Sequence, residues 1–308
     1  MIKLMYIPRR PSRLESVRLR GISHQVRLWG EPQTGQPPLV LVHGWMDVSA
    51  SWQFVVDAMR EDRFIIAPDL RGFGGTEMTG VDHYVFADYL DDLEFLLDHY
   101  APEQAVDLVG HSMGGNVCML YAGVRPARVA RLGNLEGFGM PATRPSQAPG
   151  RYVAWLDELK AFHRGETTMT RYDDAQGVAR RLMKTNPRLS DQKALWLAQH
   201  WARPDADGRW RILGDPAHKL SRANITRLDE TLELYRRITA PVLWVESSTE
   251  SLSVWWKKAN FTLAEFHQRL DEVPRVRRAK VMDAGHMLHH DQPEAVALEI
   301  ETLLAETA

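Results

Sequence analysis

The sequence predicts an α/β protein with a mostly parallel central sheet, helices on both faces of the sheet, and a helical cap inserted between two strands. Two observations predict this class. Short apolar runs alternate with segments of helical spacing over residues 14–136 and again over 238–306, as expected when crossover helices connect parallel strands. Residues 137–237 between them show helical patterns and no convincing strand. We therefore expect a core domain of residues 1–136 and 238–308 and a cap of residues 137–237.

The elements before the insert follow from the spacing of apolar residues. Residues 14–20 and 24–29 alternate apolar and polar residues, which predicts an antiparallel hairpin. Leu39–Val42 is an uninterrupted apolar run, typical of a strand buried on both faces. Further strands are expected at 64–67, 105–109 and 129–135, and helices at 51–59, with Ser51 as the N-cap, and at 84–100.

The elements from the insert onward are predicted in the same way. Within the insert, helical spacing is clearest at 152–162 and 194–201. Strand patterns then resume after residue 240, when the chain returns to the core domain. Strands are expected at 241–245 and 276–282, and helices at 261–270 and 293–304.

Composition limits the classes of function. The 308 residues include 44% hydrophobic and 25% charged residues, with a net charge of −2. This balance is ordinary for a globular protein and does not favour a nucleic-acid partner. The one cysteine, Cys118, excludes an internal disulfide and is expected to be a buried helical residue. Neither a signal peptide nor a membrane-spanning stretch is evident, so we expect a cytoplasmic protein.

One stretch carries a specific chemical signal. An apolar run enters G-H-S-M-G at residues 110–114, and a helix-compatible segment follows. This is the pattern of a nucleophile elbow, in which a serine sits on a sharp turn between a strand and a helix. Gly110 and Gly114 remove side chains that would collide in such a turn, and Ser112 is left with an exposed hydroxyl at its tip. Ser112 is therefore the candidate nucleophile.

Four motifs in order resemble those of the α/β-hydrolase family. They are H-G-W at 43–45, P-D-L-R-G-F-G-G-T at 68–76, G-H-S-M-G-G at 110–115, and A-G-H at 284–286 followed by P-E at 293–294. Each lies at the carboxyl end of a predicted strand or in the loop that follows one. The resemblance covers the core domain, and the insert is similar to the variable cap of that family. It implies a capped serine hydrolase, esterase-like or lipase-like, although the fold hosts many chemistries.

A base must activate the serine, and His286 is the best candidate. It follows the last predicted strand in a glycine-containing loop that would overhang the elbow. His111, His289 and His290 are the rivals, but His111 neighbours the serine in a sharp turn and should point away from it. The grouping of His286, His289 and His290 lacks a third-ligand motif such as H-E-x-x-H, so no metal site is assigned. No dinucleotide fingerprint or P-loop is present, and no cofactor is expected.

The carboxylate that orients the histidine has two candidates. Among members of the family it commonly follows the strand predicted at 241–245, where this chain reads P-V-L-W-V-E-S-S-T-E and places Glu250 in the usual aspartate position. In some members it follows the preceding strand and is often glutamate, and Glu136 occupies that position. We favour Glu136, because it directly follows a strand and because the later loop has lost its usual glycine. Glu250 remains the alternative.

Four further residues are predicted to form the substrate site. The backbone N–H groups of Met113 and Trp45 would stabilise an oxyanion, and Phe138 and Leu288, next to the catalytic candidates, would line the pocket. Aromatic residues of the insert also suit an apolar pocket, although each one is more simply explained by packing of the cap on the core. The aromatic residues concerned are Trp155, Phe162, Trp196, Trp201 and Trp210.

The sequence therefore predicts a cofactor-independent serine hydrolase that cleaves carboxylic esters of small to medium apolar substrates. The route would be a Ser-His-Glu triad and an acyl-enzyme. Two alternatives stay open: hydrolysis of a carbon–carbon bond by the same triad, and a ligand-binding protein with little turnover on a hydrolase scaffold. The partner expected in each case is a small molecule. Asp69 and Arg71, in the glycine-rich loop, are expected to hold that loop by hydrogen bonds.

Overall fold

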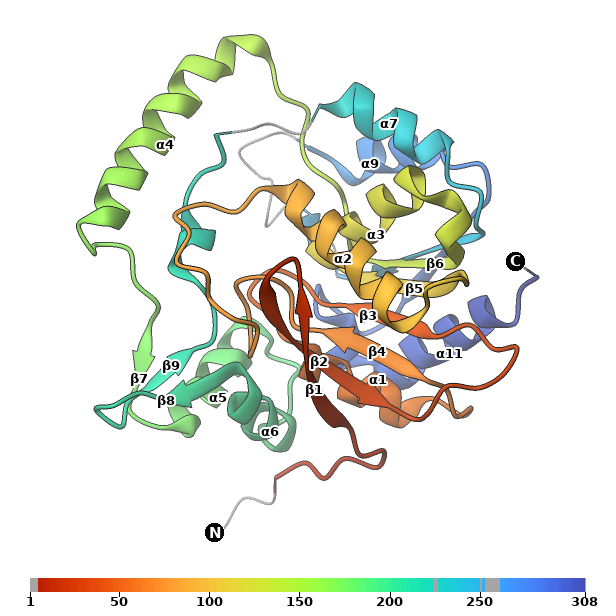
Figure 1. Ribbon diagram of the computed structural model, residues 1–308, viewed down its shortest axis with the longest axis horizontal. Helices are drawn as coiled ribbons and strands as arrows, with labels where there is room; N and C mark the ends of the chain where they lie inside the picture. The colour runs from red at the N-terminus through yellow and green to blue at the C-terminus, as the bar shows by residue number, and fades with distance from the viewer. Residues whose placement is uncertain (1–4, 224–226, 250, 253–260, 308) are drawn as a thin grey trace.

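A mostly parallel sheet lies at the centre of the molecule (Figure 1). The computed structural model describes residues 5–223, 227–249, 251–252 and 261–307. Within them the main sheet has eight strands in the order β1-β2-β4-β3-β5-β6-β10-β11. The strands are β1 (Arg13–Leu19), β2 (Ile22–Trp29), β3 (Leu39–Val42), β4 (Ile65–Pro68), β5 (Val106–His111), β6 (Val129–Leu135), β10 (Val242–Ser247) and β11 (Val276–Val281). Antiparallel pairing is confined to β1 with β2 and β2 with β4, so the predicted α/β class is confirmed.

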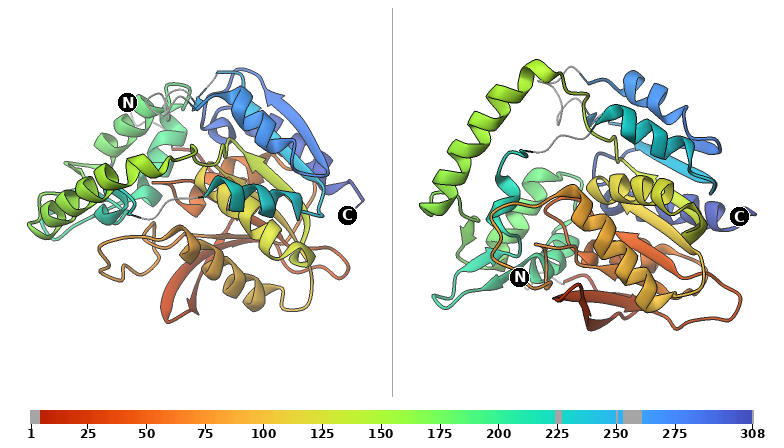
Figure 2. Two further views of the ribbon diagram at one scale, coloured as in Figure 1. Left: turned by 90° about the horizontal axis from the view of Figure 1, so that it is seen from above. Right: turned by 45° about the horizontal axis from the view of Figure 1, so that its top comes forward.

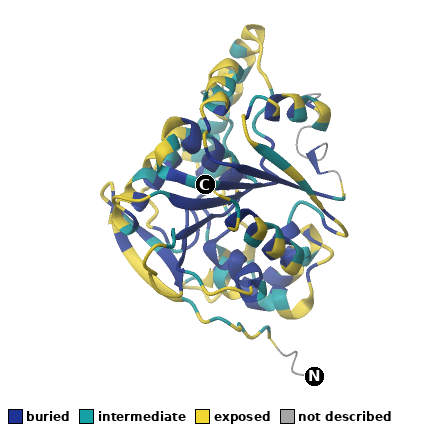
Figure 3. Ribbon diagram, turned by 90° about the vertical axis from the view of Figure 1, so that its right-hand side faces the viewer, coloured by how far each residue is buried: buried dark blue, intermediate teal, exposed yellow. Residues whose placement is uncertain are grey.

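Helices cover both faces of this sheet because its central strands are apolar on both sides. In β3, Leu39 and Leu41 face a core shared with α1 (Gln53–Ala58) and α11 (Pro293–Leu304). Val40 and Val42 face the opposite core. The helices over that core are α2 (Phe86–Tyr100), α3 (Met113–Val124), α7 (Leu228–Arg236) and α9 (Leu263–Leu270). Figure 3 shows the result, with buried strands enclosed between helices whose outer faces are exposed.

The insert leaves the sheet after β6 and returns at β10, and these two strands are neighbours in the sheet. The expectation of an insert without strands was wrong. Three short strands, β7 (Arg171–Tyr172), β8 (Ala202–Pro204) and β9 (Trp210–Ile212), form a separate antiparallel sheet in the order β7-β9-β8. Strands of two or three residues are too short to show the alternation on which a strand prediction depends.

The helices of the insert differ in how they contact the core domain. α5 (Ala175–Thr185) and α6 (Asp191–Trp201) share a hydrophobic cluster with Phe54 of α1. α7, by contrast, packs on α3. α4 (Ala148–His163) has no buried residue and extends along the edge of the molecule, away from the sheet (Figures 1 and 2). The insert is therefore anchored through α5, α6 and α7.

Two details bear on single predictions. Ser51 is not an N-cap: it lies inside a 3₁₀ turn, Ser49–Trp52, that precedes α1, and its hydroxyl donates to the carboxylate of Asp47. Cys118 is fully buried in α3, as expected. Among the residues that the structure describes, no helix combines the length and the apolar character needed to cross a membrane.

Candidate active site

Ser112 lies at the turn between β5 and α3 with φ 53° and ψ −116°, a backbone conformation that residues other than glycine rarely adopt. The flanking glycines make the turn sterically feasible. A Cβ atom on Gly110 would lie 2.6 Å from the amide nitrogen of Gly115, and one on Gly114 would lie 2.5 Å from the carbonyl oxygen of His43. Because both contacts are with backbone, no side-chain movement could relieve them. The local sequence thus builds a strained elbow with the serine at its tip.

His286 reaches the serine from the loop after β11. Its Nε2 atom lies 2.9 Å from the Oγ atom of Ser112, within hydrogen-bonding distance. Its backbone carbonyl accepts a hydrogen bond of 2.7 Å from the Nε2 atom of His111. The residue before the nucleophile therefore holds the histidine loop, while the histidine ring faces the hydroxyl. The rivals His289 and His290 are buried in the short helix α10 (Leu288–Asp291).

Glu136 directly follows β6 and is almost completely buried. Its Oε2 atom lies 3.2 Å from the Nδ1 atom of His286 and also accepts a hydrogen bond from the Ser251 hydroxyl. Its Oε1 atom accepts one of 2.6 Å from the backbone N–H of Ser247. Both oxygens are thus held as acceptors, as an ionised carboxylate requires. The alternative, Glu250, lies outside the described residues.

The loop after β3 passes beside the elbow. A Cβ atom on Gly44 would lie 3.2 Å from the Cβ atom of Ser112, so the backbone there runs against the nucleophile. Trp45 follows and leaves 40% of its surface exposed. Met113 is the first residue of α3, and the N–H groups of a first helical turn have no acceptor inside their own helix. The backbone at Gly44 and the first turn of α3 therefore both lie next to Ser112.

The two expected pocket residues lie in different surroundings. Phe138 is buried with its ring 5.3 Å from that of Trp244. It also lines a cavity of about 30 Å³ beside Glu136, room for roughly one water molecule. Leu288 is fully buried in the core cluster beneath α1 and α11, where its neighbours are core residues. Packing in this core therefore explains why an apolar residue occupies position 288.

The tryptophans of the insert that lie nearest the core serve as packing residues. Trp196 is buried in the cluster that joins the cap to α1 and has its ring 5.7 Å from that of Phe54. The indole N–H of Trp201 donates to the hydroxyl of Ser51. Both contacts attach the cap to the core domain.

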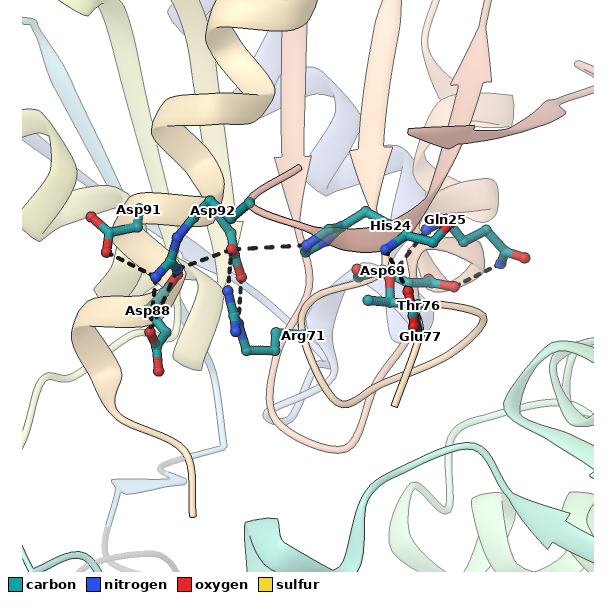
Figure 4. Close-up of polar contacts among 11 residues, drawn as sticks. His24, Gln25, Asp69, Arg71, Thr76, Glu77, Asp88, Asp91 and Asp92 are labelled. Atoms are coloured by element: carbon teal, nitrogen blue, oxygen red, sulfur yellow. Dashed lines mark hydrogen bonds and ion pairs between the residues drawn. The ribbon is translucent and has the colours of Figure 1, made fainter. Parts of the chain in front are cut away.

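The glycine-rich loop after β4 is held by polar contacts, as Figure 4 shows. Asp69 accepts hydrogen bonds from the backbone N–H groups of Ser49 and Gly75 and from the side chain of Gln25. Arg71 donates two hydrogen bonds to the buried carboxylate of Asp92. Both residues therefore have the structural contacts expected of them.

Residues that support Glu136 were not identified from the sequence. Asn134 exchanges two hydrogen bonds of 3.0 Å with the backbone of Gly137, which closes a tight turn around Glu136. Ser247 and Ser251 bind its carboxylate from the far side. The local signal for this support is the polar Asn134 in the fully buried second half of β6, residues 132–135, since a buried amide needs partners.

The arrangement has a clear chemical capacity. The imidazole lies between the hydroxyl, at 2.9 Å, and the carboxylate, at 3.2 Å. Such an arrangement can move the serine proton to the histidine and stabilise the imidazolium that results.

Comparison with known proteins agrees with the fold. A family model described as the alpha/beta hydrolase fold matches residues 37–293. A "Serine hydrolase-like protein" of Danio rerio is 24% identical over 283 residues, covering 90% of this chain and 84% of the relative. The 2-hydroxymuconate semialdehyde hydrolase of Pseudomonas sp. (strain CF600) is 37% identical over 128 residues, 40% of this chain and 45% of the relative. A thioesterase domain from the curacin biosynthetic pathway superposes with a TM-score of 0.80 and 25% identity, covering 95% of this chain and 99% of that one.

Proposed function

Because the chain belongs to the α/β-hydrolase fold family and is a hydrolase, we propose that it cleaves carboxylic ester bonds of small to medium apolar substrates through Ser112, His286 and Glu136. The reaction proceeds through an acyl-enzyme and needs no cofactor. In this scheme catalysis takes place in the core domain, residues 1–136 and 238–308. The cap, residues 137–237, controls access of the substrate.

One observation carries the proposal: the His286 ring bridges Ser112 Oγ at 2.9 Å and Glu136 Oε2 at 3.2 Å. A serine hydroxyl is a poor nucleophile until a base takes its proton. A histidine with only a structural role would not need both contacts, one ring nitrogen bonded to a serine in a strained turn and the other bonded to a buried carboxylate. The bridge therefore favours a catalytic role for all three side chains.

In the proposed mechanism the Oγ atom of Ser112 attacks the carbonyl carbon while Nε2 of His286 takes the hydroxyl proton. The substrate oxygen becomes an oxyanion and accepts hydrogen bonds from the backbone N–H groups of Met113 and Trp45. His286 returns the proton to the departing alcohol, which leaves an ester on Ser112. Water, deprotonated by His286, attacks this ester, and the acid product leaves with the serine restored.

Glu136 acts through His286. Its carboxylate accepts a hydrogen bond from the Nδ1–H group of His286, which leaves the Nε2 lone pair facing the serine, and it stabilises the imidazolium that forms during attack. The hydrogen bonds from Ser247 and Ser251 hold the carboxylate in place. The backbone of Glu136 is fixed at the end of β6. Its carboxylate can therefore hold the imidazole ring of His286 in one orientation.

A panel of p-nitrophenyl esters of graded acyl length tests the ester assignment, with Ser112→Ala as the matched control. We expect the wild type to hydrolyse neutral, apolar acyl groups and to prefer them to charged ones, because the insert is rich in aromatic residues that suit an apolar pocket. Ser112→Ala should lose this activity by on the order of 10⁴-fold or more. A preference for phosphorylated or polycarboxylate esters would contradict the substrate class.

Hydrolysis of a carbon–carbon bond is a second candidate, favoured by the similarity to the semialdehyde hydrolase. The same three side chains would serve, with a carbanion equivalent as the leaving group. A diketone substrate assayed beside the ester panel separates the two, because the enzyme should show the higher kcat/KM on its own class. A folded protein that binds these compounds but turns over neither would instead support a ligand-binding role.

A further inference from the structure

Three buried polar side chains from distant parts of the sequence meet behind the serine elbow. Asp47 follows β3, His111 is the last residue of β5, and His289 lies in α10. Each leaves 2% or less of its surface exposed. One ligand-type atom of each lies within 4.8 Å of those of the other two. Such a group of one carboxylate and two imidazoles is unusual in an interior, where polar groups normally occur as bonded pairs.

Among the described residues, Asp47 and His111 each have one polar atom held by a hydrogen bond and one without a partner, and neither ring nitrogen of His289 has a hydrogen-bond partner. Oδ1 of Asp47 accepts from the backbone N–H of Val48 at 2.8 Å and from the Ser51 hydroxyl. Nε2 of His111 bonds the carbonyl of His286. Within the described chain, no hydrogen-bond partner is found for Oδ2 of Asp47, Nδ1 of His111 or either ring nitrogen of His289.

The absence of hydrogen-bond partners for these buried atoms, in the part of the chain that the structure describes, destabilises the folded protein. An unsatisfied buried donor or acceptor destabilises the folded state, and four such atoms occur together. They do not satisfy one another, since Nε2 of His289 lies 3.7 Å from Oδ2 of Asp47, beyond hydrogen-bonding distance. A shared ligand between them would remove most of the cost.

The orientation of the atoms identifies the class of ligand. Because Nε2 of His111 donates to a carbonyl, the neutral ring presents a lone pair at Nδ1. A histidine that ligates a metal typically donates its other ring N–H to a carbonyl or carboxylate in this way. Asp47 likewise has one oxygen held and one free. Two imidazole nitrogens and a carboxylate oxygen are a donor set suited to zinc and similar ions.

We propose that Asp47 Oδ2, His111 Nδ1 and His289 Nε2 form a binding site for a divalent transition-metal ion of the zinc class. Ligand atoms at about 2.0–2.2 Å from zinc stand about 3.5 Å apart in a tetrahedral site, so the three side chains close by on the order of 1 Å when the ion binds. The single carboxylate balances part of the buried charge. The sequence alone predicts no metal site, because the three ligands are far apart along the chain and only the histidines near residue 286 lie close together in it.

The ion would join the loop that carries Trp45, the strand that leads into Ser112, and the helix that follows His286. Its predicted effect is to hold these three segments together and so to stabilise the fold. This inference does not depend on the chemistry proposed for Ser112, because stability and metal content can be measured without a substrate.

The test starts from the full-length protein stripped with a chelator, dialysed, and mixed with ZnCl₂. After gel filtration we expect about one equivalent of zinc by elemental mass spectrometry and a higher Tm than for the stripped protein. Asp47→Asn and His289→Gln should each lose zinc retention and the gain in Tm. His290→Gln is the matched control, since His290 is also buried in α10 but is not a ligand in the proposal; it should keep both.

Two outcomes would overturn the proposal: a wild type that retains no zinc, or variants at Asp47 and His289 that retain as much as the wild type. Should the variants fail to fold, wild-type crystals soaked in zinc decide the matter by anomalous diffraction. A peak between the three named atoms supports the site, and its absence from that position overturns it.

Discussion

The backbone N–H of Ser247 donates a hydrogen bond of 2.6 Å to the Oε1 atom of Glu136. Ser247 ends β10, and the loop that starts there is the one in which members of the family commonly carry the acid partner of the histidine. In this chain the beginning of that loop binds a carboxylate supplied by the neighbouring strand. The two positions are adjacent because β6 and β10 pair in the sheet.

The first prediction follows from this contact. Glu136→Gln should lower kcat/KM for esters by at least about 10²-fold, because the amide can no longer stabilise the imidazolium. Glu250→Gln is the matched control and should retain activity within about tenfold of the wild type. Steady-state kinetics of both variants shows which of the two glutamates is the acid partner of His286. Full activity in Glu136→Gln together with a large loss in Glu250→Gln would show that the acid lies in the later loop.

The second prediction concerns the elbow. Gly114→Ala should destabilise the fold by about 1–3 kcal/mol, because its Cβ atom would lie 2.5 Å from the carbonyl oxygen of His43. Gly150→Ala in α4 is the control, since a Cβ atom there meets nothing within 4 Å; it should be neutral or stabilising by up to about 1 kcal/mol. Urea unfolding measures both. Equal stability of the two variants would contradict the steric explanation.

The third prediction concerns the glycine-rich loop. Asp92 is buried and accepts two hydrogen bonds from Arg71, so Asp92→Asn should cost about 3–5 kcal/mol by leaving a buried guanidinium without its counter-charge. Asp91→Asn is the control. Asp91 is exposed and lies 3.5 Å from Arg20, and its loss should change stability by less than about 1 kcal/mol. A mild effect of Asp92→Asn would show that the loop is held by other contacts.

The fourth prediction concerns acid stability. His218 is stacked between Phe73 and Tyr84, with ring centroids 4.0 Å and 3.8 Å away, and burial lowers its pKa from 6.5 to about 3. The unfolded chain therefore binds a proton between these pH values that the folded chain does not, and stability falls as the pH drops below about 6.5. At about 1.4 kcal/mol per pH unit, His218 accounts for up to about 2 kcal/mol between pH 6.5 and 5.

Urea unfolding at pH 7 and pH 5 tests this effect. His218→Phe should lose less stability on acidification than the wild type, because the phenyl ring takes up no proton. His163→Gln is the control, since His163 is exposed, and its loss of stability should match that of the wild type. The same acid sensitivity in His218→Phe would assign the proton uptake to other histidines.

Local pattern predicted much of the fold. β3, β6 and α11 begin and end where the apolar spacing places them. β3 is a continuous buried run, and α11 is an amphipathic segment that begins at Pro293. The strands β7, β8 and β9 were missed because two or three residues carry no period. Ser51 was misjudged because the preference for an N-cap competes with its hydrogen bond to Asp47.

For the site, sequence motifs named the candidates but not their contacts. His286 lies within hydrogen-bonding distance of both Ser112 and Glu136, while the catalytic roles of the three residues remain predictions. Local pattern favoured Glu136 over Glu250, but it did not reveal the contacts of Glu136 with the loop after β10, since these depend on how β6 and β10 pair. The group of Asp47, His111 and His289 was beyond prediction, because its members lie more than sixty residues apart along the chain and meet only after the sheet forms.

The most direct test of the proposed mechanism is the mass of the folded protein after treatment with a fluorophosphonate, which reacts only with an activated serine. For the wild type we expect one adduct per chain, mapped to Ser112 by peptide mass spectrometry. We expect no adduct in Ser112→Ala and slower labelling in Glu136→Gln. An unlabelled folded wild type, or a label on another residue with ester hydrolysis preserved in Ser112→Ala, would contradict the proposed mechanism.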